Sequence, residues 1–122
     1  MTGRLVHLEL HTGDLRAARD FYARLLGWRP DRVVTDAGTY LTMSAAGDVG
    51  AGIVACSSPR PVWLPYVQVN DIEVSTARAI ELGAAAILEP REGPAGFRSV
   101  IRQAGAGEVA LWQPKREGER SP

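Results

Sequence analysis

A chain of 122 residues, 45% of them apolar, is long enough for one domain with a substantial core. Fourteen basic residues balance fourteen acidic ones and form no basic stripe, which argues against a nucleic-acid or anionic-membrane partner. One cysteine, Cys56, excludes an internal disulfide framework and is expected to be a small buried side chain. No leader-like or bilayer-length apolar run is present, so we expect a cytoplasmic protein.

The first predicted strand, residues 6–11, alternates strictly between two faces. One face carries only valine and leucine and is expected to meet a core. The other face carries His7, Glu9 and His11. Three titratable groups in a row are more than a structural strand needs, so these residues are candidates for function.

A helix is predicted directly after this strand. The side chain of Asp14 can cap its first turn, apolar residues follow at helical spacing to Leu25, and Gly27 supplies a left-handed stop. Short strands are predicted at residues 32–34, 40–44 and 49–56. Residues 57–62, which contain serine and proline, are predicted to be a linker.

The opening pattern returns after the linker. Residues 64–69 are again extended, Asp71 again caps a helix over 72–82, and Gly83 again ends it. Three more strands are predicted at 85–88, 97–102 and 108–112. Alignment of the two caps pairs positions of the first strand with positions of its repeat: His7 with Leu64, Glu9 with Tyr66 and His11 with Gln68.

These elements predict an α+β fold of two βαβββ modules, each with a curved mixed sheet covered on one face by its helix. A single domain is expected over residues 1–114, with modules at 4–56 and 63–114. The opposite sheet faces are expected to form a trough between them. Residues 115–122, which include Lys115, are expected to be a polar, solvated tail.

Two motifs then resemble the vicinal oxygen chelate superfamily, which includes glyoxalase I, bleomycin-resistance proteins and extradiol dioxygenases. They are HxxLxxGDL at residues 7–15 and FYxxLLGW at residues 21–28. The stretch WLPYVQVNDIEVSTARAIELGA, followed by GEVALWQP, resembles uncharacterised actinobacterial glyoxalase-like proteins. The resemblance implies paired βαβββ modules around a cleft, and it implies a fold more firmly than a chemistry.

Metal-dependent members of that superfamily hold an ion at four cleft-facing positions. The resemblance places these positions at His7, within residues 49–53, at Leu64 and at Ala110. Only His7 is a ligand type, and a divalent cation needs three or four protein donors. A shifted set of His7, Glu9 and His11 would not converge, because residues two apart on a strand are about 6 to 7 Å apart. We therefore expect no metal and no other cofactor.

The predicted trough carries aromatic surface and a few polar groups, which suits a small apolar or aromatic ligand. Its expected lining is His7, Glu9, His11, Tyr40 (or its neighbours Leu41 and Met43), Leu64, Tyr66, Gln68, Ala110 and Trp112. We assign catalysis to His7 and Glu9, because a carboxylate can fix the tautomer and raise the basicity of an imidazole. Tyr66 is a candidate donor to a developing oxyanion.

Several of these residues could instead have a purely structural role. Glu9 can instead brace the sheet through backbone amides or Arg98, and His11 can brace the adjacent loop. Trp28 and Trp63 are expected in the core or at a hinge, whereas Trp112 is the tryptophan expected to meet ligand.

Three functions remain open on the sequence alone. The first is a cofactor-free isomerase, cyclase or lyase acting on an aromatic metabolite such as a polyketide. The second is a protein that sequesters an antibiotic without chemistry, and the third is a metal-dependent lyase or dioxygenase with displaced ligands. The neutral net charge disfavours a strongly cationic ligand, and the resemblance implies a homodimer.

Overall fold

The computed structural model describes residues 3–35, 38–44, 49–57 and 60–116. The chain divides into two compact units, one formed by Val6–Leu64 and the other by Met1–Leu5 together with Pro65–Pro122. We call these module one and module two and describe each by itself. Within the described residues, neither helix is long and apolar enough to cross a bilayer. The sequence-predicted linker includes residues 58–59, which lie outside the described residues, as do 117–122 of the predicted tail.

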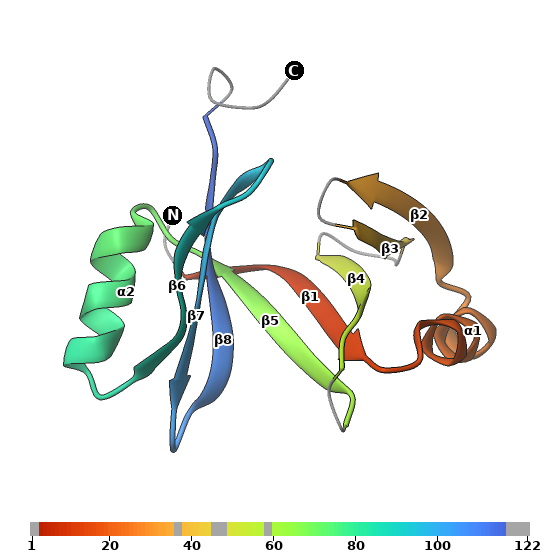
Figure 1. Ribbon diagram of the computed structural model, residues 1–122, viewed down its shortest axis with the longest axis horizontal. Coiled ribbons are helices and arrows are strands. Elements are labelled where there is room, and N and C mark those ends of the chain that lie inside the picture. The colour runs from red at the N-terminus through yellow and green to blue at the C-terminus, as the bar shows by residue number, and fades with distance from the viewer. Residues whose placement is uncertain (1–2, 36–37, 45–48, 58–59, 117–122) are drawn as a thin grey trace. The chain divides into compact units, whose positions relative to one another are not determined.

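Module one is a four-stranded mixed sheet with one helix (Figure 1). Its strand order is β2-β3-β4-β1, in which β1 runs parallel to β4 and the other pairs are antiparallel. The side chain of Asp14 accepts a hydrogen bond from the Ala17 amide and starts the helix, and Gly27, at φ 72°, ends it. The elements are β1 (Arg4–Thr12), α1 (Leu15–Leu26), β2 (Arg29–Thr35), β3 (Gly38–Ser44) and β4 (Gly50–Ala55).

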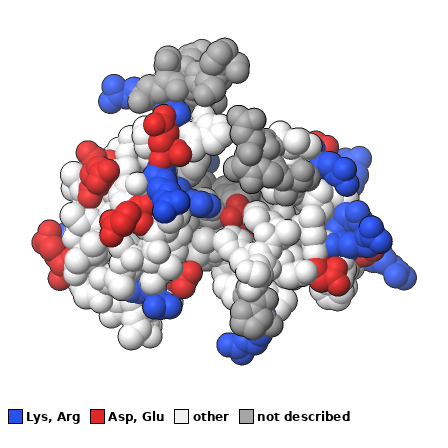
Figure 2. All heavy atoms as spheres, in the orientation of Figure 1, with Lys and Arg blue, Asp and Glu red and all other residues white. Residues whose placement is uncertain are grey.

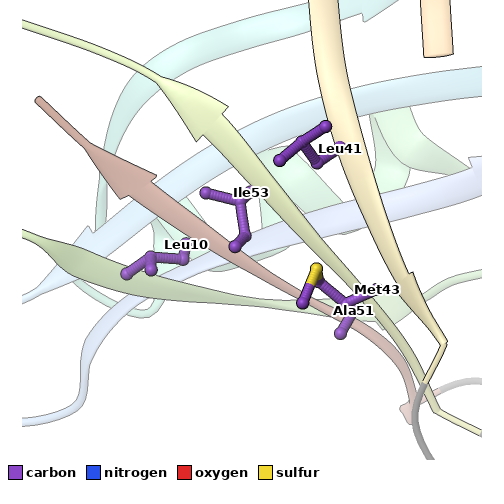
Figure 3. Packing of buried hydrophobic residues seen from close by; sticks show 5 residues of the cluster. All are labelled: Leu10, Leu41, Met43, Ala51 and Ile53. Atoms are coloured by element: carbon purple, nitrogen blue, oxygen red, sulfur yellow. The ribbon is translucent and has the colours of Figure 1, made fainter. Parts of the chain in front are cut away.

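The core of module one lies on the face of its sheet that α1 covers. Figure 3 shows its five buried side chains projecting from three neighbouring strands, β1, β3 and β4: Leu10, Leu41, Met43, Ala51 and Ile53. Trp28 and Trp63 pack against this cluster, and the ring of Tyr22 stacks on Trp28 at a centroid distance of 5.5 Å. Both tryptophans are half-buried and lie at the edge of the core rather than within it.

Module two repeats this topology, with strand order β6-β7-β8-β5 and β5 parallel to β8. The side chain of Asp71 accepts from the Val74 amide at 3.1 Å, which confirms the second predicted cap. Gly83, at φ 100°, supplies the predicted left-handed turn after the helix. The elements are β5 (Val62–Gln68), α2 (Ile72–Glu81), β6 (Ala85–Glu92), β7 (Gly96–Gln103) and β8 (Gly107–Pro114).

A buried polar contact fastens α2 to its sheet. The Thr76 hydroxyl donates to the Ile72 carbonyl at 2.6 Å and lies 2.8 Å from the Ser99 hydroxyl on β7. Both side chains are almost fully buried, with exposed fractions of 3% and 0%. An apolar cluster that includes Ile72 of α2 and Leu111 of β8 also joins the helix to the sheet. The helix and the sheet of module two are therefore closely packed against each other.

Two expectations about single residues are wrong. Cys56 is exposed rather than buried, because it follows the end of β4 and lies outside the alternation that buries Ile53. Lys115 is buried rather than solvated: its ammonium contacts the Glu92 carboxylate at 2.6 Å and lies 5.8 Å from the centre of the Phe97 ring. The aliphatic stem of a lysine can cover apolar surface while its charge is paired, which explains the burial.

Candidate functional site

Three titratable side chains form a chain of contacts on β1, on the face opposite the Leu10 core. Glu9 lies between two imidazoles: one carboxylate oxygen is 2.8 Å from Nε2 of His11, and the other is 3.5 Å from Nε2 of His7. The Glu9 side chain is 15% exposed and each imidazole is 29% exposed, so all three are reachable by a small ligand. The structure thus brings together the row predicted from alternation.

The partner of Glu9 differs in part from the expectation. Of its contacts with the two imidazoles, the shorter is with His11, whereas the sequence pointed to His7. At 3.5 Å the His7 contact is an ion-pair distance and is long for a hydrogen bond. The Glu9 carboxylate therefore contacts both imidazoles.

Two glycines on β4 make room for the His7 ring. A Cβ at Gly50 would lie 3.1 Å from Nδ1 of His7, and a Cβ at Gly52 would lie 3.3 Å from both Cε1 and Nε2. These contacts are tighter than side chains normally make, so the imidazole lies close against the bare β4 backbone. Glycine inside a strand commonly marks such a close approach.

Tyr40 on β3 is half-buried. Its neighbours Leu41 and Met43, which the sequence offered as alternatives for the trough, belong to the core cluster instead. Because successive strand residues point to opposite faces, Tyr40 shares the face of His7 rather than that of the core. Its assignment to ligand binding stays a prediction.

In module two, Tyr66, Arg98 and Trp112 share the sheet face opposite α2. Nη1 of Arg98 donates to the Tyr66 hydroxyl at 2.9 Å, and the Tyr66 and Trp112 rings are 6.3 Å apart. Arg98 lies directly opposite Trp112 in the β7–β8 register. Sequence reasoning considered Arg98 only as a partner for Glu9 and missed its contact with Tyr66, which joins residues far apart in the chain.

Gly96 on β7 provides the space that the Trp112 indole occupies. A Cβ there would lie 2.6 and 2.7 Å from Cζ2 and Cη2 of the indole and 2.5 Å from the Gln113 carbonyl oxygen. The remaining predicted residues differ in exposure. Leu64, which groups with module one, and Ala110 are buried, with exposed fractions of 4% and 0%, whereas Gln68 is half-buried. Ala110 is the register partner of Tyr66.

The donor set does not fit the metal of the superfamily's metal-dependent members. Among the described residues, no three His, Cys, Asp or Glu side chains are grouped so that they could hold an ion. Gly50 and Gly52 occupy β4 beside His7, and Leu64 and Ala110 carry no donor atom in their side chains. The described residues therefore do not fit the metal chemistry of those members.

Paired βαβββ modules, each with its first and last strands parallel, define the class of the glyoxalase and bleomycin-resistance fold. The model of the Glyoxalase/Bleomycin resistance protein/Dioxygenase superfamily matches residues 4–103, and the chain belongs to this superfamily. The resemblance inferred from the two sequence motifs is confirmed.

Relatives and solved structures agree with this assignment. The chain is 33% identical over 111 residues to the "Anthracycline biosynthesis protein DnrV" of Streptomyces peucetius, covering 86% of this chain and 40% of that protein. It is 29% identical over 117 residues to the "Putative glyoxylase CFP32" of Mycobacterium tuberculosis, covering 89% of this chain. The chain therefore spans less than half the length of these curated relatives, 45% in the case of CFP32.

A crystal structure of methylmalonyl-CoA epimerase from Mycobacterium tuberculosis has the same fold. It superposes with a TM-score of 0.69 at 18% identity and covers 94% of this chain and 89% of that one. At this identity the likeness establishes the fold alone.

Proposed function

We propose that this protein is a metal-independent enzyme that acts on a small, largely apolar or aromatic metabolite by acid/base chemistry. The reaction would be an isomerisation, a cyclisation or a lyase step, each of which begins with proton removal beside a carbonyl. The observation that carries the proposal is the Glu9 carboxylate between two imidazoles, at 2.8 and 3.5 Å.

In this proposal His7 is the base. Its imidazole takes a proton from the carbon next to the ligand carbonyl, and the electron pair of the broken C–H bond moves into an enolate. Glu9 then stabilises the imidazolium that forms, while the hydrogen bond from His11 holds the carboxylate in place. Return of the proton from His7 to another carbon completes an isomerisation without any redox partner.

Ligand recognition is assigned to module two. The half-buried Trp112 ring offers aromatic surface for a flat ligand, and the Tyr66 ring, which is 6% exposed, lies beside it. A phenol that accepts a hydrogen bond from a guanidinium is a stronger donor, so the Arg98 contact suits Tyr66 to stabilise an enolate oxygen. The name of the Streptomyces relative supports this ligand class, because anthracyclines are fused aromatic compounds with carbonyl groups.

The test is hydrogen exchange of a simple aromatic ketone, β-tetralone, in D2O, followed by proton NMR. We expect the protein to accelerate exchange of the acidic CH2 above the rate in buffer containing the same concentration of free imidazole. His7→Gln and Glu9→Gln should each lower the rate by about 10²-fold or more, the usual contribution of a general base. Glu108→Gln, at an exposed position of β8, is the matched control and should leave the rate unchanged.

The alternative is sequestration of an antibiotic-like molecule, which the aromatic face of module two also favours. In that case the protein binds β-tetralone, Trp112→Leu weakens binding, and exchange never exceeds the imidazole control. Exchange that is unaffected by His7→Gln would likewise contradict the enzyme proposal. Stoichiometric zinc, iron, nickel or manganese in the purified protein would refute metal independence.

We also propose a homodimer. Proteins of this superfamily commonly form dimers, which supports the proposal. Light scattering on a size-exclusion column measures the mass directly, and a monomer across micromolar concentrations would contradict this part of the proposal.

A further inference from the structure

A row of side chains crosses the sheet of module two on the face opposite α2. Each is the register partner of the next: Arg91 on β6 pairs with Arg98 on β7, Arg98 with Trp112 on β8, and Trp112 with Gln68 on β5. Register partners point to the same face, and neighbouring strands lie about 4.8 Å apart. The sheet therefore places two arginine side chains next to each other and next to an indole.

Contacts on the other face of the same strands support this orientation. Phe97, next to Arg98 in the chain, packs against the apolar cluster that joins α2 to the sheet. Glu92, next to Arg91, contacts the Lys115 ammonium, which lies 5.8 Å from the centre of the Phe97 ring. Because successive strand residues point to opposite faces, Arg91 and Arg98 both point away from the helix. The carboxylate closest to them in the chain is engaged on the helix side.

The charges of the two arginines are not neutralised by this chain. Within the described residues, neither Arg91 nor Arg98 forms an ion pair with a carboxylate. Nη1 of the half-buried Arg98 donates to the Tyr66 hydroxyl at 2.9 Å, which uses one of the five N–H groups of a guanidinium. Figure 2 shows a group of basic side chains, with acidic ones nearby, on the surface that the strands of module two form. Like charges directly opposite each other destabilise a sheet, and an anion bound between them would remove this penalty.

The repeat provides an internal comparison. When the two modules are aligned through their caps and strand registers, Tyr40 of module one takes the position of Arg98. The partner of Tyr40 across the β2–β3 pair is Val33, whereas the partner of Arg98 across the β6–β7 pair is Arg91. The fold therefore does not require facing arginines at this position, and they occur in the module to which ligand recognition is assigned.

We propose that the ligand recognised by module two is a flat aromatic carboxylate, with its ring on Trp112 and its carboxylate on Arg98 and Arg91. The inference rests on the proposed function, which assigns ligand recognition to this module, and it adds the anionic group. A carboxylate joined to an aromatic ring lies near the plane of that ring, so a ligand stacked on the indole can extend across one strand spacing to Arg98. Guanidinium groups bind carboxylates in bidentate geometry.

The test uses amide chemical-shift titrations of the full chain with three probes: 2-naphthoate, 2-naphthamide and acetate. We expect 2-naphthoate to bind with a Kd on the order of a millimolar or below and to shift the amides of Arg91, Arg98 and Trp112. 2-Naphthamide has the same shape without the charge and should bind about tenfold more weakly. Acetate has the charge without the ring and should also bind more weakly.

Three variants test the assignment of the charge. Arg91→Gln and Arg98→Gln should each weaken 2-naphthoate about tenfold and change 2-naphthamide little. Arg102→Gln is the matched control, because Arg102 lies on the same face of β7, about 6 to 7 Å from Arg98, with Glu108 as its register partner. It should bind 2-naphthoate as the natural chain does. Tyr66→Phe removes the hydroxyl that contacts Arg98 and should keep the preference for 2-naphthoate, which a purely supporting role of Arg98 would not predict.

Equal affinity for 2-naphthoate and 2-naphthamide would overturn the inference. Equal losses in the variants of Arg91, Arg98 and Arg102 would also overturn it, because they would indicate diffuse charge attraction. The proposed function is tested separately, since β-tetralone carries no anionic group. Exchange of β-tetralone without a preference for 2-naphthoate would refute this inference alone, whereas the preference without exchange would support the inference and refute the catalysis.

Discussion

Gly96 is the position where the addition of a single methyl group should lower the free energy of unfolding most. In Gly96→Ala the new Cβ would lie 2.5 Å from the Gln113 carbonyl oxygen and 2.6 Å from Cζ2 of Trp112. Real Cβ atoms essentially never approach other atoms so closely, and the carbonyl cannot move without bending β8. Overpacking of this kind costs about 1–3 kcal/mol of unfolding free energy, and we expect the upper part of that range because backbone is involved.

Urea unfolding followed by circular dichroism measures this change, and Tm should fall by roughly 4 °C per kcal/mol for a chain of this size. Gly93→Ala is the control, because its Cβ would meet only the Gly96 carbonyl oxygen, at 3.6 Å. In a Trp112→Leu background the contacts with the indole ring are absent, whereas the contact with the Gln113 carbonyl oxygen remains. Gly96→Ala should therefore lower the free energy of unfolding by less in that background. Equal stability of Gly96→Ala and Gly93→Ala would refute the placement of the indole over Gly96.

Three further changes test other contacts. Gly52→Ala places a Cβ 3.3 Å from the His7 ring, so it should slow β-tetralone exchange about tenfold with little effect on urea unfolding; an unchanged rate would contradict the close packing of His7 on β4. Thr76→Val leaves the buried Ser99 hydroxyl without its contact and should cost about 1–3 kcal/mol in urea unfolding, largely restored when Ser99→Ala is added. Asp71→Ala removes the α2 cap and should cost about 1 kcal/mol, whereas Asp71→Asn should not; equal stability of these two variants would exclude a capping role.

Local signals were enough to predict the fold. Alternation located β1 and β5, and the Asp caps and Gly stops bounded α1 and α2, because these signals act within a few residues. Strand lengths were less accurate. The sequence predicted the first strand of module two after α2 at residues 85–88, but β6 continues through Pro90 to Glu92. A proline is tolerated there because β6 is the last strand in the order of its module and an edge strand need not donate from every amide.

The candidate site was predicted only in outline. The alternation of residues along the strand placed His7, Glu9 and His11 on one face. Which of the two imidazoles makes the 2.8 Å contact with the Glu9 carboxylate depends on side-chain rotamers, which a sequence pattern does not encode. The contact of Arg98 with Tyr66 joins separate strands and has no local signal. The strand glycines did offer a signal, since glycine inside a strand often marks a place where another group approaches the backbone.

In the proposed function, proton transfer is assigned to module one of the duplicated fold and ligand recognition to module two. The same position of the repeat carries Glu9 in module one and Tyr66 in module two, and glycines on a neighbouring strand make room for the His7 ring and for the Trp112 ring. A change that removes only transition-state interactions lowers kcat, whereas a change that removes uniform binding raises KM. Variants at His7 should therefore act mainly on the rate of exchange, and variants at Trp112 mainly on the concentration of ligand needed for half-maximal rate. The same effect from both residues would mean that the two modules do not divide the work in this way.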